Sequence, residues 1–139
     1  MRVLVVDDSE VVRSRLAEML SVVEGVEVVG EAVDAVEALE LQARMQPDTL
    51  ILDIRMPGGN GIDVLQEVKR SYPGTSVIIL TNYPYDQIRS ACNRLGADYF
   101  FDKSSEFEKI PQALLVLRNN RETQARDRGE ISGQTPESG

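Results

Sequence analysis

Five short apolar runs, each followed by a helix-like segment, are the feature that most constrains the fold of this chain. The runs lie at residues 3–6, 26–30, 49–52, 76–80 and 97–101. The first, third and fourth are almost wholly apolar, which is typical of strands buried on both faces of a parallel sheet. Repeated alternation of strand and helix predicts an α/β fold, with a doubly wound sheet of five parallel strands in the order 2-1-3-4-5.

The connecting segments carry recognisable helix signals. Asp34 with Glu37 resembles a capping box before the second helix, and Asn60 can cap the third. Pro111 predicts the start of the fifth helix, because proline is tolerated in the first turn but not in a helix interior. Residues 104–109 are therefore expected to form a separate helical turn.

The length of 139 residues suits one domain, which we place at residues 1–120. Residues 121–139, "RETQARDRGEISGQTPESG", are polar, with Ile131 their one large apolar side chain. We interpret this segment as a disordered tail.

Charge and composition exclude several classes of function. A net charge of −8 argues against direct binding of nucleic acid and of an anionic membrane surface. The absence of histidine excludes histidine metal sites and Ser–His or Cys–His catalysis. Cys92 lies at helical spacing from Ile88 and Leu95, which predicts a buried packing residue. No run has transmembrane length and no signal peptide is present, so we expect a cytoplasmic protein.

Polar residues gather where the expected strands end. Asp7 and Asp8 follow the first strand, Asp53 the third and Thr81 the fourth, and Lys103 comes after the fifth. The carboxyl ends of parallel strands share one edge of a sheet, so these side chains can converge. Taken singly, each has an ordinary explanation: a helix cap for Asp8, a turn residue for Thr81, a solvated charge for Lys103.

Together they suggest phosphoryl chemistry. Three carboxylates without a histidine or cysteine ligand suit Mg²⁺. A carboxylate such as Asp53 can attack phosphorus to give an aspartyl phosphate. The metal, Lys103 and the Thr81 hydroxyl can then stabilise charge on the phosphoryl oxygens.

At these residues the chain resembles the receiver domain of bacterial two-component response regulators, of the stand-alone, single-domain type. The matching segments are "VLVVDDS" at 3–9, "LILDIRMPGGNGID" at 50–63, "ILTNY" at 79–83 and "YFFDKS" at 99–104. The resemblance spans about residues 1–120 and implies a flavodoxin-like (βα)5 fold.

The resemblance also implies a role for each matching residue. Asp53 would be the phosphorylated residue, and Mg²⁺ would be bound by Asp7, Asp8, Asp53 and the backbone carbonyl of Arg55. Thr81 and Lys103 would contact the phosphoryl group.

Three further positions would tune this switch. Phe100 stands at the switch-aromatic position and would change rotamer when Thr81 moves toward the phosphoryl group. Arg55 and Tyr83, each two residues after a site residue, would shield Asp53 and lengthen the phosphoryl lifetime.

The expected function is a phosphorylation-dependent signalling switch rather than a conventional enzyme. A sensor histidine kinase or phosphotransfer protein would phosphorylate Asp53, and the face of helix 4, strand 5 and helix 5 would then bind a downstream protein or a second copy. The 19 residues after Asn120 are too few for a DNA-binding module, so the chain would be a stand-alone regulator or a receiver cut from a longer protein.

Two alternatives remain. A Mg²⁺-dependent phosphatase with an aspartyl-phosphate intermediate would need an acid where this chain has Arg55. A phosphorylation-independent interaction module could use the same fold.

Overall fold

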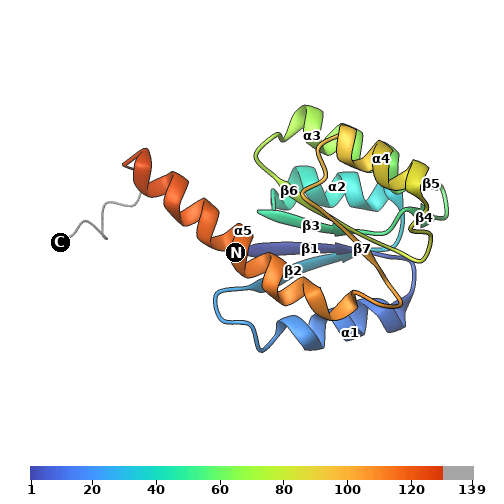
Figure 1. The fold of residues 1–139 in the computed structure, drawn as a ribbon, viewed down its shortest axis with the longest axis horizontal. Coiled ribbons are helices and arrows are strands. Elements are labelled where there is room, and N and C mark those ends of the chain that lie inside the picture. The colour runs from blue at the N-terminus through green and yellow to red at the C-terminus, as the bar shows by residue number, and fades with distance from the viewer. Residues whose placement is uncertain (130–139) are drawn as a thin grey trace.

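A parallel five-stranded sheet lies at the centre of the structure, a computed structural model that describes residues 1–129 (Figure 1). Its strands are β1 (Arg2–Val6), β2 (Glu27–Ala32), β3 (Thr49–Leu52), β6 (Ser76–Thr81) and β7 (Tyr99–Asp102). Their order is β2-β1-β3-β6-β7, and every neighbouring pair is parallel. The predicted fold class and the predicted order 2-1-3-4-5 are confirmed.

Helices cover both faces of the sheet. They are α1 (Glu10–Leu20), α2 (Ala35–Met45), α3 (Gly61–Ser71), α4 (Asp86–Arg94) and α5 (Ile110–Asp127), with a 3-10 turn, η1 (Phe107–Lys109), before the last. In Figure 1, α1 and α5 lie on one face and α2, α3 and α4 on the other. The predicted caps are confirmed: Asp34 accepts from the Glu37 N–H at 2.8 Å, and Asn60 from the Ile62 N–H at 2.8 Å. Pro111 lies in the first turn of α5, as predicted.

Two apolar layers explain why the central strands have no polar face. Val5 and Ile51 point toward α1 and α5, whereas Leu4 and Leu50 point toward α2 and α3, and all four are buried. Because successive side chains of a strand face opposite ways, both directions must be apolar in a sheet covered on both sides. Cys92 is fully buried in the apolar layer between the sheet and helices α2, α3 and α4, as predicted.

The observed strands differ from the sequence-based expectation in their bounds and in an additional hairpin. β2 runs to Ala32 because Val6 at the end of β1 pairs with it, and β7 starts at Tyr99, which pairs with Ile78. A two-residue hairpin, β4 (Arg55–Met56) with β5 (Gly59–Asn60), follows β3 and was not predicted. Its turn depends on positive φ angles at two glycines, Gly58 and Gly59.

The predicted start of the disordered tail, residue 121, lies too early in the chain. α5 continues to Asp127, so residues 121–127 are helical, and the assignment of disorder to them was wrong. Arg121 holds this part of the helix to the sheet, because its guanidinium donates to the carbonyls of Asp48 and Gly74. Residues 130–139, including Ile131, lie outside the described residues. Across residues 1–129, no helix has both the length and the apolar character required to cross a bilayer.

Candidate functional site

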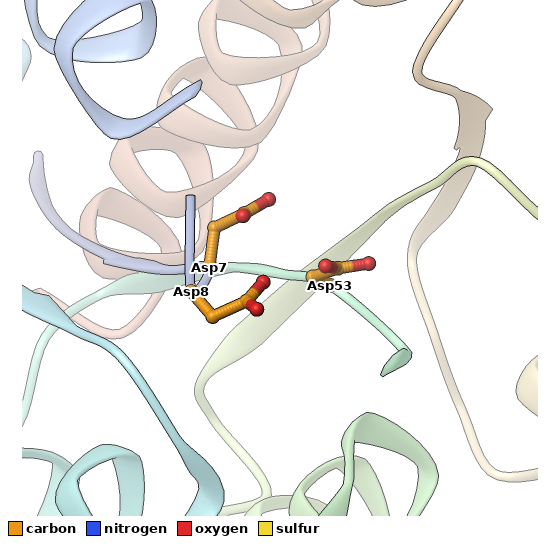
Figure 2. Close-up of side chains that lie close together, drawn as sticks. All are labelled: Asp7, Asp8 and Asp53. Atoms are coloured by element: carbon orange, nitrogen blue, oxygen red, sulfur yellow. The ribbon is translucent and has the colours of Figure 1, made fainter. Parts of the chain in front are cut away.

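Three carboxylates meet where β1 and β3 end (Figure 2). Asp7 and Asp8 directly follow β1, and Asp53 directly follows β3, the neighbouring strand. One carboxylate oxygen from each lies within 4.8 Å of the others. The parallel pairing of two adjacent strands therefore brings together residues that are 46 and 45 positions apart in the chain.

Asp7 and Asp8 have different surroundings. Asp7 is buried: one carboxylate oxygen accepts the Ser9 N–H at 2.8 Å and the other accepts Lys103 Nζ at 2.7 Å. Asp8 is exposed, and within residues 1–129 its carboxylate accepts no hydrogen bond. Ser9 caps α1 by accepting from the Val12 N–H, so Asp8 is not needed as a cap. The Asp8 carboxylate is thus available to bind a cation from outside the chain.

Asp53 lies in an environment that disfavours its charge. Its side chain is 8% exposed, and burial raises the pKa of the carboxyl above its usual value. The ammonium of Lys103, 3.4 Å from Asp53 Oδ2, opposes this rise, while the charge of Asp7 adds to it. One ammonium therefore serves two buried carboxylates.

The loop after Asp53 folds back tightly behind it. Gly61 donates its N–H to the Ile54 carbonyl at 2.6 Å. A Cβ at position 61 would lie 2.1 Å from the backbone oxygen of Asp53, so only glycine fits without moving the backbone. Gly61 belongs to the segment at 50–63 on which the sequence resemblance rested, and the structure gives it a steric reason.

Thr81 and Lys103 complete this edge of the sheet. Thr81 ends β6, is fully buried, and accepts the Tyr83 N–H on Oγ1 at 2.9 Å. The Lys103 N–H donates to the Thr81 carbonyl at 2.7 Å, which joins the ends of β6 and β7. All five residues singled out at the strand ends therefore lie on the same edge of the sheet.

Arg55 and Tyr83 pack against each other beside this cluster. The Arg55 Cζ lies 4.0 Å from the centroid of the Tyr83 ring, the geometry of a cation–π contact. The hairpin β4–β5 presents Arg55 and the segment after β6 presents Tyr83. The sequence indicated that both flank the site, but gave no signal that they stack.

Phe100 lies in the middle of β7 and is 7% exposed, packed with the layer of α2, α3 and α4. Arg89 of α4 covers its ring, with Cζ 4.4 Å from the centroid. Sequence reasoning missed Arg89, because no motif marks an arginine that contacts a strand 11 residues further along the chain.

Comparison with known proteins agrees with this site. Residues 3–115 match the family described as the response regulator receiver domain. The response regulator GacA of Pseudomonas aeruginosa is 33% identical over 113 residues, which are 81% of this chain and 53% of GacA. A protein-glutamate methylesterase/protein-glutamine glutaminase of Alkalilimnicola ehrlichii is 37% identical over 81% of this chain, but only 30% of that protein. The chain spans about half the length of the GacA relatives that it matches.

Solved structures agree. The isolated receiver domain of RcsB from Salmonella enterica serovar Typhimurium, solved with the phosphomimetic BeF3−, has a TM-score of 0.81 at 31% identity, covering 86% of this chain and 88% of that one. The response regulator domain of Thermotoga maritima CheB has a TM-score of 0.75 at 34% identity, covering 86% and 94%. With its fold, its strand-end cluster and these matches in agreement, the chain belongs to the response regulator receiver domain family.

Proposed function

We propose that this receiver domain works as a signalling switch in which Asp53 accepts a phosphoryl group from a sensor histidine kinase or phosphotransfer protein. The observation that carries the proposal is the position of Asp53. Its buried carboxylate lies within 4.8 Å of those of Asp7 and Asp8 and 3.4 Å from the Lys103 ammonium. A nucleophile, a set of metal ligands and a cation thus occur within one small site.

The donor set fits Mg²⁺. Asp7, Asp8 and Asp53 offer three hard oxygen ligands, and the Asp8 carboxylate has no partner within residues 1–129. The backbone carbonyl of Arg55 would be a further ligand. When bound, the ion supplies positive charge against the oxygens of the entering phosphoryl group.

The chain's own residues carry out the transfer. An Asp53 carboxylate oxygen forms the new bond to phosphorus as the bond from phosphorus to the donor's imidazole nitrogen breaks. Lys103 already lies between Asp7 and Asp53, so its ammonium can shift toward a phosphoryl oxygen without a large movement. The Thr81 hydroxyl accepts from Tyr83 and keeps its own hydrogen to donate to that oxygen.

Phosphorylation then changes a surface. Movement of Thr81 toward the phosphoryl group would free space for Phe100 to change rotamer, and the face of α4, β7 and α5 would bind a downstream protein or a second copy. Arg55 stacked on Tyr83 would restrict the access of water to the phosphorylated Asp53 and lengthen its lifetime.

Intact-protein mass spectrometry tests the proposal. The protein is incubated with acetyl phosphate, with and without Mg²⁺, alongside Asp53→Asn. We expect a gain of one phosphoryl group that requires both Mg²⁺ and Asp53. Folded wild-type protein that gains no phosphoryl group and binds no beryllofluoride would contradict it and favour a phosphorylation-independent module.

A phosphatase is the less suitable candidate. The position two residues after Asp53, where such an enzyme would need an acid, holds Arg55, and its guanidinium is engaged on the Tyr83 ring.

A further inference from the structure

Asp8 differs from Asp7 and Asp53 in how its carboxylate is held. Within residues 1–129 the exposed Asp8 carboxylate accepts no hydrogen bond, whereas those of Asp7 and Asp53 both pair with Lys103. In Figure 2 the Asp8 carboxyl group nevertheless points to the side of Asp53, and one oxygen from each of the three aspartates lies within 4.8 Å of the others. Because the Asp8 side chain has no partner there, its direction depends on the backbone that carries it.

The peptide between Asp7 and Asp8 is held by Arg13 of α1. Arg13 Nη1 donates to the Asp7 carbonyl at 2.8 Å, and this carbonyl belongs to the peptide that leads into Asp8. On the other side of Asp7, its N–H donates to the Ala32 carbonyl of β2 at 3.0 Å. A planar peptide cannot turn without losing such a bond, so Arg13 fixes the direction in which Asp8 leaves the chain.

Arg13 is itself anchored at both ends. Its backbone N–H donates to the Ser9 carbonyl at 3.0 Å in the first turn of α1, and its Nε pairs with Glu31 Oε1 of β2 at 2.9 Å. The Arg13 side chain is 14% exposed. A guanidinium presents its donors in a rigid fork, so this one group holds Glu31 and the Asp7 carbonyl together. Helix α1 and strand β2 are thus joined through Arg13 to the backbone that carries Asp8.

We propose that Arg13 is a positioning residue for the Mg²⁺ site, which holds the Asp8 carboxylate ready for the ion. An arginine has no lone pair to offer a metal, so it acts through Asp8 and not as a ligand. Residues that orient metal ligands from behind raise the affinity for the metal, because the ligands are in place before it arrives. The inference rests on the proposed function and adds to it the residue that prepares one of the metal ligands.

The charge of Arg13 and its hydrogen bond act on a bound cation in opposite directions. A guanidinium near the site repels Mg²⁺, so the loss of its charge alone would tighten binding. The loss of the bond to the Asp7 carbonyl frees the peptide before Asp8 and weakens binding. The direction of the change in Arg13→Met therefore separates positioning from simple electrostatics.

An NMR titration of ¹⁵N-labelled protein with MgCl₂ at constant ionic strength measures this direction. We expect the dissociation constant for Mg²⁺ to rise about 5- to 10-fold in Arg13→Met. Arg13→Lys keeps the charge but not the fork, and should show a smaller rise; it serves as the second variant if Arg13→Met does not fold. Arg15→Met is the matched control, because Arg15 lies on the same helix but stacks on the Phe107 ring, with Cζ 4.2 Å from the centroid. It should bind Mg²⁺ at least as tightly as wild type.

The same samples report on the peptide without the metal. The Asp8 N–H belongs to the peptide whose carbonyl Arg13 holds, so its ¹⁵N order parameter in metal-free protein should fall in Arg13→Met and not in Arg15→Met. A purely structural role of Arg13 would lower the unfolding temperature and leave both the order parameter of Asp8 and the Mg²⁺ affinity as in wild type.

The outcomes are distinguishable. Wild type that binds no Mg²⁺ would overturn the metal site of the proposed function, and this inference with it. Wild type that binds, together with Arg13→Met that binds equally or more tightly, would overturn the inference alone. Weaker binding by Arg13→Met and not by Arg15→Met, with a more mobile Asp8 peptide, would support it.

Discussion

The two ends of the sheet differ in whether their charged side chains have partners within the protein. We call the end where the strands begin the amino edge, with Arg2, Asp48 and Arg121, and the end where they finish the carboxyl edge. At the amino edge every one of these charged groups has a partner within the protein. At the carboxyl edge, within residues 1–129, the Lys103 ammonium pairs with two of the three clustered carboxylates and the third has no partner.

At the amino edge the partners are largely backbone carbonyls. Arg2 donates from Nη1 to the Met45 carbonyl at 2.7 Å, and its N–H donates to Asp48 Oδ2 at 2.7 Å. Arg121 donates to the Asp48 and Gly74 carbonyls, and its guanidinium lies 3.7 Å from an Asp48 carboxylate oxygen. These side chains donate hydrogen bonds to backbone carbonyls of the loops between elements, and thereby stabilise the fold.

At the carboxyl edge, Lys103 must serve both Asp7 and Asp53, and Asp8 has no partner within residues 1–129. Carboxylates held close together without enough positive charge destabilise a fold. The comparison indicates that one edge is arranged for stability and the other for a ligand from outside the chain.

The largest effect should come from removing Lys103, the cation that pairs with both Asp7 and Asp53 at the carboxyl edge. Lys103→Met should slow phosphorylation by acetyl phosphate about 100-fold, because the developing phosphoryl charge loses its ammonium. The time course of intact mass measures this rate. Lys109→Met, an exposed lysine on η1, is the control and should react like wild type. A Lys103→Met rate equal to that of wild type would contradict the role of Lys103.

The matching change at the amino edge should affect stability and not chemistry. Arg121→Ala removes the donor from two carbonyls and should lower the free energy of unfolding by about 1–3 kcal/mol. Urea denaturation measures the loss, and the phosphorylation rate should not change. Arg126→Ala, exposed on the same helix, should cost much less. Equal losses for the two variants would refute the anchoring role of Arg121.

Beside the carboxyl edge, the Arg55–Tyr83 stack should affect lifetime by a smaller factor. Arg55→Ala should shorten the half-life of phosphorylated Asp53 about 2- to 5-fold, because the cover of the site is lost with the cation–π contact. The decay of the phosphorylated mass peak measures it. In a double-mutant cycle with Tyr83→Ala the two effects should not add. Additive effects, or an unchanged half-life, would exclude a joint role.

The smallest effect concerns the charge of Asp53 itself in metal-free protein. The pKa of Asp53 is raised in the folded state, mainly by burial, so the folded protein binds this proton more tightly than the unfolded chain. The ionised carboxylate therefore destabilises the fold above its folded-state pKa, and this penalty disappears as pH falls below the unfolded value of about 3.9.

With EDTA present, Asp53→Asn should unfold at a higher temperature than wild type at pH 7, and the difference should shrink as the pH is lowered toward 4. Thermal unfolding followed by circular dichroism across this range measures it. An asparagine variant that is less stable at pH 7 would show that Asp53 is not strained by burial.

Pattern and motif were enough to predict the sheet and the carboxyl edge. Continuous apolar runs identify strands covered on both faces, and the shared direction of parallel strands brings Asp7, Asp53 and Lys103 to one edge. These inferences need only the backbone topology.

The features that were missed depend on contacts between side chains and distant backbone. Apart from Ala125, residues 121–127 are polar, and their helix is held through Arg121 by carbonyls more than 40 positions away. The stacking of Arg55 on Tyr83 and of Arg89 on Phe100 likewise depends on rotamers that no sequence spacing specifies. The hairpin after β3 depends on two glycine φ angles.

A Mg²⁺ titration of thermal unfolding in wild type and Asp8→Asn tests most directly whether the carboxyl edge binds a cation. Asp8 is exposed and unpartnered within residues 1–129, so its replacement should leave the fold intact and remove only a ligand. We expect a saturable rise in the unfolding temperature of wild type with Mg²⁺, not reproduced by KCl at equal ionic strength and strongly reduced in Asp8→Asn. No saturable rise in wild type, or an equal rise in both proteins, would contradict the claim that the carboxyl edge is arranged to bind a cation.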